Sequence, residues 1–205
     1  MAESMLNYDE AQLLDVLKAM PPDARLACAT AAATRMVPAC ERFATLYATP
    51  GQGRARQIAA AMWHCIEGND PNPPNWRAAL NEVLGMIPGE DVEGGMVALL
   101  AEDALACLAY ALRCLLTDDL QQAAWALGRE YDATDQAAIA MLGIKPKNAK
   151  QEAKILSHPL VQRALGRQYQ DMMLVHQDDF AELQRQAYAQ PAFTEQELTS
   201  FSSVK

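Results

Sequence analysis

The sequence is poor in the side chains that β-strands favour. Aromatic residues make up 6% of its 205 residues and β-branched residues are scarce, whereas hydrophobic residues make up 51%, most of them alanine, leucine and methionine. Alanine, leucine and methionine lose little conformational freedom in a helix, while strands are stabilised by branched and aromatic side chains that pack on the pleated surface. The composition therefore excludes a sheet-based core and predicts an all-α protein.

Basic side chains are also in short supply. The chain has 17 lysines and arginines against 26 aspartates and glutamates, which gives a formal net charge of −9. A surface of this sign repels phosphate backbones and anionic lipid headgroups, and it speeds the encounter with a basic protein. The charge therefore argues against nucleic acid and membrane surfaces as partners. Two interpretations of it stay open: it keeps the protein in solution, or it attracts a protein partner that is basic.

Long uncharged segments are absent as well. Residues 96–116 form the most apolar stretch, but Glu102, Asp103 and Arg113 interrupt it, so we expect a buried central helix there and not a membrane span. Acidic residues interrupt residues 1–14, which argues against a secretory leader. The five cysteines are odd in number and lie within apolar helical patterns, where free thiols pack as small hydrophobes. These features predict a cytoplasmic protein.

Capping residues, prolines and apolar periodicity place the predicted helices. They lie at about residues 8–20, 22–47, 54–67, 76–86, 96–116, 120–142 and 160–188. Pro38 predicts a kink in the second helix, and residues 132–134 an interruption in the sixth. Residues 145–154 read as a basic connector, and residues 191–205 as a loose polar tail. Because no linker is long enough to separate domains, residues 1–205 are predicted to form one domain, a compact irregular bundle of about seven to eight helices around the central apolar helix.

Asp103 is the most anomalous residue in the sequence. On a helical projection it lies within the apolar stripe of residues 96–116, and an ionised carboxylate there needs a cation or several hydrogen bonds. Arg35 is the predicted partner. Two interpretations stay open. One is a buried ion pair that sets the register of two helices, and the other is a carboxylate with a shifted pKa in a pocket that Arg35 and Tyr110 also line.

The residues needed for metal, nucleotide or nucleophilic chemistry lack the required spacing. The histidines lie on three predicted elements, and His64 with Glu67 forms a single H-x-x-E pair, where helical di-metal sites use E-x-x-H twice. Gly51 and Gly53 follow no strand and precede no G-K-S or G-K-T, so a phosphate-binding loop is not predicted. No nucleophile signature with an adjacent base is found. We therefore predict no catalytic residue, no metal site and no cofactor.

Four short segments, taken in order, resemble a known family. They are Arg25-Leu26-Ala27-Cys28, Thr34-Arg35-Met36-Val37-Pro38, Ala101-Glu102-Asp103-Ala104 and His158-Pro159-Leu160-Val161. Over residues 24–185 the chain resembles the YjaG-like bacterial family, catalogued as domain of unknown function 416, and Arg35, Pro38 and Asp103 fall on the family's recurrent positions. The resemblance implies a compact, all-helical, cytoplasmic bacterial protein without an established enzymatic activity, and it carries over no catalytic residue. Residues 128–154 depart from the family pattern.

These observations predict a non-enzymatic, acidic, helical protein-binding module. One version is an immunity-type inhibitor that covers the active site of a basic toxin such as a nuclease. The predicted contact residues are acidic: Glu90, Asp91, Glu93, Asp178 and Asp179. One alternative is a ligand-binding protein or enzyme with a pocket around Asp103. Another is a housekeeping homo-oligomer, a homodimer for example, that pairs through an apolar stripe on the last helix. The stripe consists of Leu165, Tyr169, Met172, Met173 and Phe180.

Overall fold

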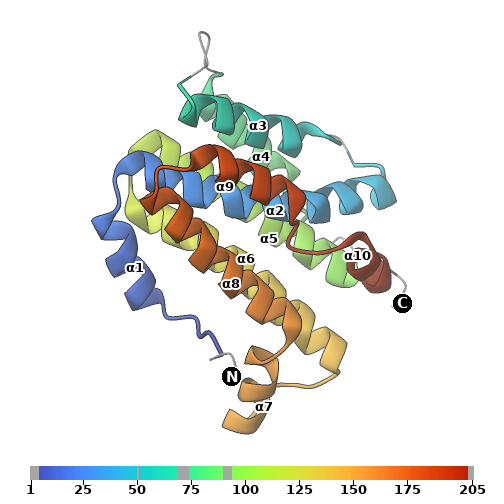
Figure 1. Cartoon of the computed structure of the whole chain (residues 1–205). Helices are drawn as coiled ribbons and strands as arrows, with labels where there is room; N and C mark the ends of the chain where they lie inside the picture. The colour runs from blue at the N-terminus through green and yellow to red at the C-terminus, as the bar shows by residue number, and fades with distance from the viewer. Residues whose placement is uncertain (1–4, 50, 69–73, 90–93, 203–205) are drawn as a thin grey trace.

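Helices account for all the regular structure in the part of the chain that can be described. The computed structural model describes residues 5–49, 51–68, 74–89 and 94–202, and within these ranges it contains ten helices and no strand (Figure 1). The all-α prediction is confirmed, whereas the predicted seven to eight helices are too few. In chain order the helices are α1 (Glu10–Ala19), α2 (Pro22–Tyr47), α3 (Arg54–Ile66), α4 (Trp76–Met86), α5 (Gly95–Thr117), α6 (Leu120–Leu142), α7 (Ala149–Leu156), α8 (Pro159–His176), α9 (Phe180–Ala189) and α10 (Glu195–Ser202).

Several helix ends lie where the capping residues predict them. The side chain of Asp119 caps α6, Gly143 ends α6 in the left-handed conformation with φ 61°, and Pro159 occupies the first turn of α8. α2 continues through Pro38 without a break. The predicted interruption at residues 132–134 is wrong, because α6 continues through them. In α2 the packing of the helix against its neighbours outweighs the loss of one backbone hydrogen bond at the proline.

The predicted long C-terminal helix is two helices. α8 ends at His176 and α9 begins at Phe180, and Asp178 between them has a left-handed backbone with φ 56°. Asp179 then caps α9 by accepting a hydrogen bond from the backbone N–H of Glu182. Aspartate tolerates the left-handed region better than most residues, and a side-chain cap stabilises a helix start by about 1 kcal/mol. The two consecutive aspartates therefore separate α8 from α9.

Two segments predicted to be irregular each contain a short helix. α7 lies within the predicted basic connector and is capped by Asn148. The predicted loose tail is folded: Thr194 and Glu197 form a capping box at the start of α10, in which each side chain accepts a hydrogen bond from the other's backbone N–H. Phe193 and Phe201 are buried, with their ring centroids 6.4 Å apart. Because burying a large apolar side chain stabilises by about 1.5–3 kcal/mol, these two rings hold the segment on the bundle.

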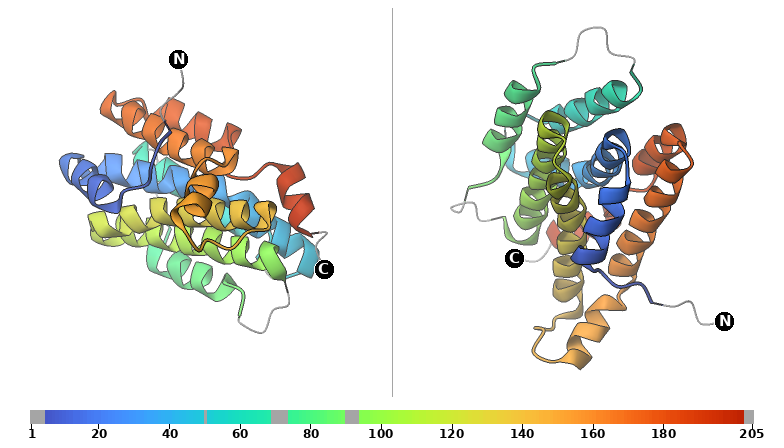
Figure 2. Two further views of the ribbon diagram at one scale, coloured as in Figure 1. Left: turned by 90° about the horizontal axis from the view of Figure 1, so that it is seen from below. Right: turned by 90° about the vertical axis from the view of Figure 1, so that its left-hand side faces the viewer.

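The core is built around α5 and α2. α5 packs against α2, α4, α6 and α10, and α2 also packs against α3, α6, α8 and α9 (Figures 1 and 2). α2 contributes small, fully buried side chains to these contacts: Ala27, Cys28, Ala29, Ala31, Ala32 and Ala33. Small side chains let helices approach closely while the interior stays densely packed. α1 packs on α6, and Figure 2 shows it between α6 and α8 along one side of the bundle.

α5 is the only described helix whose length and composition would suffice to cross a membrane. In the fold, 67% of the most apolar segment of α5 is buried inside the protein. Burial on several sides by other helices is typical of the core helix of a globular domain, and this agrees with the central position predicted for residues 96–116.

Candidate functional site

Asp103 is buried on α5, but its partner is Arg129 on α6 and not Arg35. Nη1 of Arg129 donates a hydrogen bond to Oδ1 of Asp103 at 3.1 Å, and the Arg129 side chain is 39% exposed. Burial raises the pKa of Asp103 to about 6, although Arg129 opposes this shift. The predicted pair of Asp103 with Arg35 is therefore wrong, because Asp103 contacts α6 and does not face the arginine of α2.

Tyr110 lies two turns along α5 from Asp103, on the same face. The centroid of the Tyr110 ring lies 5.4 Å from that of Trp125, and the guanidinium of Arg113 lies 5.5 Å from the centroid of the same Tyr110 ring. Burial acts to lower the pKa of Arg129, but the charge of Asp103 and a hydrogen bond to Tyr110 outweigh it and raise the pKa. The fold thus brings together Asp103, Tyr110 and Arg129, which we call the Asp103 cluster. The arginine in this cluster is Arg129 and not the predicted Arg35. None of them lines a pocket described below.

Arg35 is paired with Asp171 on α8, which the sequence analysis did not single out. Nη1 and Nη2 of Arg35 donate hydrogen bonds to the two carboxylate oxygens at 2.5 and 2.6 Å, and both side chains are 1% exposed. This is the bidentate geometry of a charge-assisted pair. A signal for it was present, because Arg163, Arg167 and Asp171 recur every four residues and so share one face of α8.

Three further polar residues extend this buried pair. Nε2 of Gln168 donates hydrogen bonds to the carbonyl of Leu127 at 2.9 Å and to Oε2 of Glu130 at 3.3 Å. In contrast, Oε1 of Glu130 and the Nε and Nη1 atoms of Arg167 are buried without a hydrogen-bond partner among the described residues. Burial raises the pKa of Glu130 and lowers that of Arg167 to about 10, while each group's charge opposes the other's shift. The buried charge cluster consists of Arg35, Glu130, Arg167, Gln168 and Asp171.

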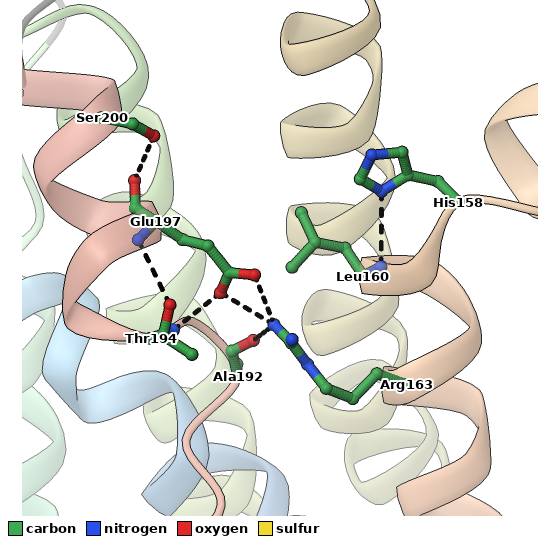
Figure 3. A network of polar contacts seen from close by, with 7 residues as sticks. All are labelled: His158, Leu160, Arg163, Ala192, Thr194, Glu197 and Ser200. Atoms are coloured by element: carbon green, nitrogen blue, oxygen red, sulfur yellow. Dashed lines mark hydrogen bonds and ion pairs between the residues drawn. The ribbon is translucent and has the colours of Figure 1, made fainter.

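Arg163 fastens the C-terminal helix to α8 (Figure 3). Its Nη2 atom donates hydrogen bonds to both carboxylate oxygens of Glu197, at 3.0 and 2.8 Å, and to the carbonyl of Ala192 at 3.1 Å. At the start of α8, Nδ1 of His158 accepts a hydrogen bond from the backbone N–H of Leu160 at 3.3 Å, and burial lowers the pKa of His158. These contacts satisfy helix ends and hold α10 against the bundle.

The described residues offer no activated nucleophile among their buried thiols. Burial raises the pKa of Cys28 and Cys107, that of Cys40 to about 12, and that of Cys114 to about 11. A raised pKa keeps a thiol protonated and unreactive at neutral pH. Within the same described ranges, no group of three or more histidine, cysteine, aspartate and glutamate side chains could hold a metal ion. The buried thiols are therefore packing residues.

A groove with a mainly apolar lining lies between α1 and α8. It consists of two pockets, of about 370 and 500 Å³, that share Val16 and Met172. Its apolar lining includes Leu6, Leu13, Val16, Ala19, Met20, Leu165, Met172, Met173 and Val175. Besides two tyrosines, the titratable side chains that line it are Asp9 in the first pocket and His176 and Asp178 in the second. No lysine or arginine lines this surface, which we call the α1–α8 groove.

The groove is lined by residues from two of the predicted interaction surfaces, the apolar stripe of the homo-oligomer and the acidic contacts of the protein-binding module. Four members of the predicted apolar stripe line it: Leu165, Tyr169, Met172 and Met173. Tyr169 and Met173 are 60% and 46% exposed, whereas Phe180, the fifth member, is partly buried against the core. Of the predicted acidic contacts, Asp178 lines the groove and Asp179 caps α9. The other three, Glu90, Asp91 and Glu93, lie outside the described residues.

The fold matches that of a solved structure. The crystal structure of a DUF416 family protein from Shewanella baltica OS155, at 1.91 Å resolution, superposes with a TM-score of 0.76 over 86% of this chain and 93% of that chain, at 14% sequence identity. DUF416 is the family that the sequence motifs resemble, so the resemblance is confirmed at the level of the fold. No family model matches the sequence, and the search of curated proteins found no match.

Proposed function

We propose that this protein is a non-enzymatic protein-binding module whose partner is basic. The fold, which is that of a DUF416 family protein, does not indicate a function, so the proposal is based on the surface. The observation that supports this most directly is the α1–α8 groove, which combines an apolar lining with acidic residues and has no lysine or arginine. Together with the net charge of −9, this surface attracts a cationic partner and gives it apolar area to bury.

The polar groups elsewhere support binding rather than catalysis. The Arg35–Asp171 pair is sealed in the interior, and Asp103 is engaged by Arg129. A catalytic acid or base needs to lie within hydrogen-bond reach of a substrate in a concave site. The pockets described above do not include Asp103, Arg129 or Asp171 in their lining. An enzyme built around the Asp103 cluster is for this reason the less favoured alternative.

One concrete version of the proposal is an immunity-type inhibitor. A toxin that acts on nucleic acid carries a basic active-site surface, and an acidic protein that covers this surface competes with the phosphate backbone for it. Charge complementarity of this kind also raises the association rate, which an inhibitor of a toxic enzyme requires.

The proposal is tested by purification from the native cell. We expect the tagged full-length chain to retain one basic protein at about 50 mM salt and to release it at about 500 mM salt, because screening weakens exposed charge pairs. The two purified proteins should then re-form a complex of defined stoichiometry, measured by calorimetry. If no basic protein co-purifies at low salt, or if the purified pair does not associate, the proposed function is wrong.

A homo-oligomer is the alternative that the exposed Tyr169 and Met173 favour. Two copies would each bring a net charge of −9, so like-charge repulsion opposes this pairing. Light scattering of the purified chain distinguishes the two: a monomer agrees with the acidic binding module, and a stable dimer at micromolar concentration would support the homo-oligomer instead.

A further inference from the structure

We infer that the α1–α8 groove binds a single amphipathic helix of the partner, with the apolar face of that helix in the groove and basic residues at both ends of the contact. This inference rests on the proposed function, because it specifies which part of a basic partner is bound and where. It joins the apolar stripe and the acidic contact residues, two features that the sequence analysis assigned to different functions.

The groove has the form that a helix requires. Residues 6–16 and 165–172 line the first pocket, and residues 16–24 and 172–178 line the second, so the groove follows α1 and α8 in the same direction. α1 has ten residues, and at about 1.5 Å per residue it is about 15 Å long, or about three helical turns. Because the pockets share Val16 and Met172, the surface is continuous. A continuous groove of this length suits apolar side chains at positions i, i+3 or i+4, and i+7 of a bound helix.

The side chains of the groove are suited to this occupant. Met20, Met172 and Met173 supply flexible thioether side chains, which adapt to apolar partners of varied shape. Tyr169 adds a large exposed ring on one wall. Large contiguous patches of exposed apolar side chains are rare on monomeric proteins, and they mark interaction sites.

Charge specifies the ends of the bound helix. Asp9 lines the first pocket and Asp178 the second, and these acids lie near opposite ends of the groove. A helix that spans them has apolar residues in the middle and a lysine or arginine near each end. A second copy of this chain is a poorer occupant, because it would bring its own Asp9 and Asp178 to the same surface.

The groove is formed before any partner binds. The segment that precedes α1 is fixed by two hydrogen bonds between the backbone of Leu6 and the side chain of Gln162, both at 2.9 Å. The ring of Tyr8 stacks on Tyr131 with the centroids 4.3 Å apart. A rigid, preformed site loses less conformational entropy on binding and so binds more tightly for the same contact area.

The experiment uses the full-length chain and two fluorescein-labelled peptides of about 14 residues, the length of a four-turn helix. The first has leucines at helical i, i+3, i+4, i+7 spacing and lysines near both ends; the second has the same composition in scrambled order. By fluorescence anisotropy we expect the amphipathic peptide to bind with 1:1 stoichiometry, and the scrambled peptide to bind at least about tenfold more weakly, because it cannot present one apolar face.

Two matched double variants locate the binding site. Tyr169→Ala with Met173→Ala removes exposed side chains from the groove, and Tyr188→Ala with Met141→Ala removes a comparably exposed tyrosine and methionine elsewhere on the surface. We expect the groove variant to bind the amphipathic peptide at least about tenfold more weakly, and the control variant to stay within about twofold of the parent. Circular dichroism verifies that both variants are folded.

Three results would overturn the inference. They are equal binding of the two peptides, equal effects of the two double variants, and a dimer that Tyr169→Ala with Met173→Ala dissociates. The first two outcomes describe binding by charge alone and leave the proposed function standing, since that fails only if no basic partner is found. The third would assign the groove to a second copy of the chain.

Discussion

Arg35 and Arg167 are the two buried arginines among the described residues, and the protein treats them differently. Arg35 is 1% exposed, and both of its Nη atoms donate to Asp171, which leaves only its Nε without a hydrogen-bond partner among the described residues. Arg167 is 8% exposed, and both its Nε and its Nη1 lack such a partner there. Both lie within the same cluster, and Arg167 is one helical turn from Asp171 on α8. Burial alone therefore does not decide what a charged side chain contributes to stability.

The difference follows from the cost of desolvation. A buried charge is held at a cost of several kcal/mol unless its partner and its hydrogen bonds compensate for the loss of water. Arg35 has this compensation from a carboxylate with matching geometry. Arg167 has only the longer-range attraction of Glu130 and Asp171, and burial lowers its pKa to about 10. The comparison predicts that removing the partner of Arg35 is damaging, while removing Arg167 itself is not.

The largest effect is expected for Asp171→Ala. This change leaves the guanidinium of Arg35 buried without its counter-charge, so we expect the free energy of unfolding to fall by about 3–5 kcal/mol. Urea denaturation followed by circular dichroism measures the loss. The double variant Arg35→Met with Asp171→Leu removes both charges and should be much less destabilised than the single change. If the double variant loses as much stability as the single variants Arg35→Met and Asp171→Leu lose together, the two residues are not coupled and the pair is not a stabilising unit.

Asp103 extends the comparison to a pair at the edge of the core. Because its folded pKa of about 6 lies above its ordinary value, the folded state holds the proton more tightly than the unfolded state. The stabilisation that results is present below about pH 4 and is lost as the pH rises through about 6. Asp103→Asn removes this titration. Between about pH 4 and pH 6 the free energy of unfolding of the parent should therefore fall by up to about 3 kcal/mol more than that of the variant. Parallel pH profiles of the variant and the parent, measured by urea denaturation, would contradict the assignment.

Arg163 lies on the same face of α8 as Arg167 and Asp171, and its side chain is 31% exposed. Arg163→Ala removes three hydrogen bonds to Glu197 and Ala192, but water replaces part of what is lost, so we expect about 1–2 kcal/mol of local destabilisation. The effect should be confined to the C-terminal segment, and hydrogen exchange should accelerate in α10 while α2 and α5 keep their protection. Uniform acceleration across the chain would show that α10 and the core unfold together.

The smallest effect, and the one with the opposite sign, is expected for Arg167→Met. Methionine fills a similar volume without a charge to desolvate, so the free energy of unfolding should be unchanged or rise by about 1 kcal/mol. Glu130 loses the nearby positive charge, which shifts its pKa in the direction that burial already sets, toward the uncharged acid. A loss above about 2 kcal/mol would show that Arg167 is paired in solution.

Most helices could be predicted from capping residues and apolar periodicity. The errors lie at the break between α8 and α9 and in the C-terminal segment, where these local signals are weak. The capping box Thr194-x-x-Glu197 was readable in the sequence, but the polar residues around it conceal how deeply Phe193 and Phe201 are buried. The break between α8 and α9 depends on the left-handed backbone of Asp178. Neither property is visible in hydrophobic periodicity, so the predicted helix count is too low.

The site was predicted in part for a related reason. Periodicity shows that Asp103 lies on an apolar face, and this was sufficient to predict its burial. It does not show which neighbouring helix that face contacts. The choice between Arg35 and Arg129 depends on how α2 and α6 are rotated about their axes, which is a property of the assembled fold. The α1–α8 groove is of the same kind, because it exists only once α1 is placed beside α8.

The Arg35–Asp171 pair also has a consequence for the synthesis of the chain. The two residues are 136 positions apart in the sequence, and at about 5–20 residues per second a ribosome needs roughly 7–27 s to add Asp171 after Arg35. During that interval α2 carries a positive charge that its apolar neighbours cannot accommodate in a dry interior. A nascent or truncated chain without α8 therefore keeps this part of α2 hydrated, and the burial of Arg35 waits for the synthesis of Asp171. Burial of this part of α2 therefore depends on the synthesis of α8, whatever the state of the earlier helices.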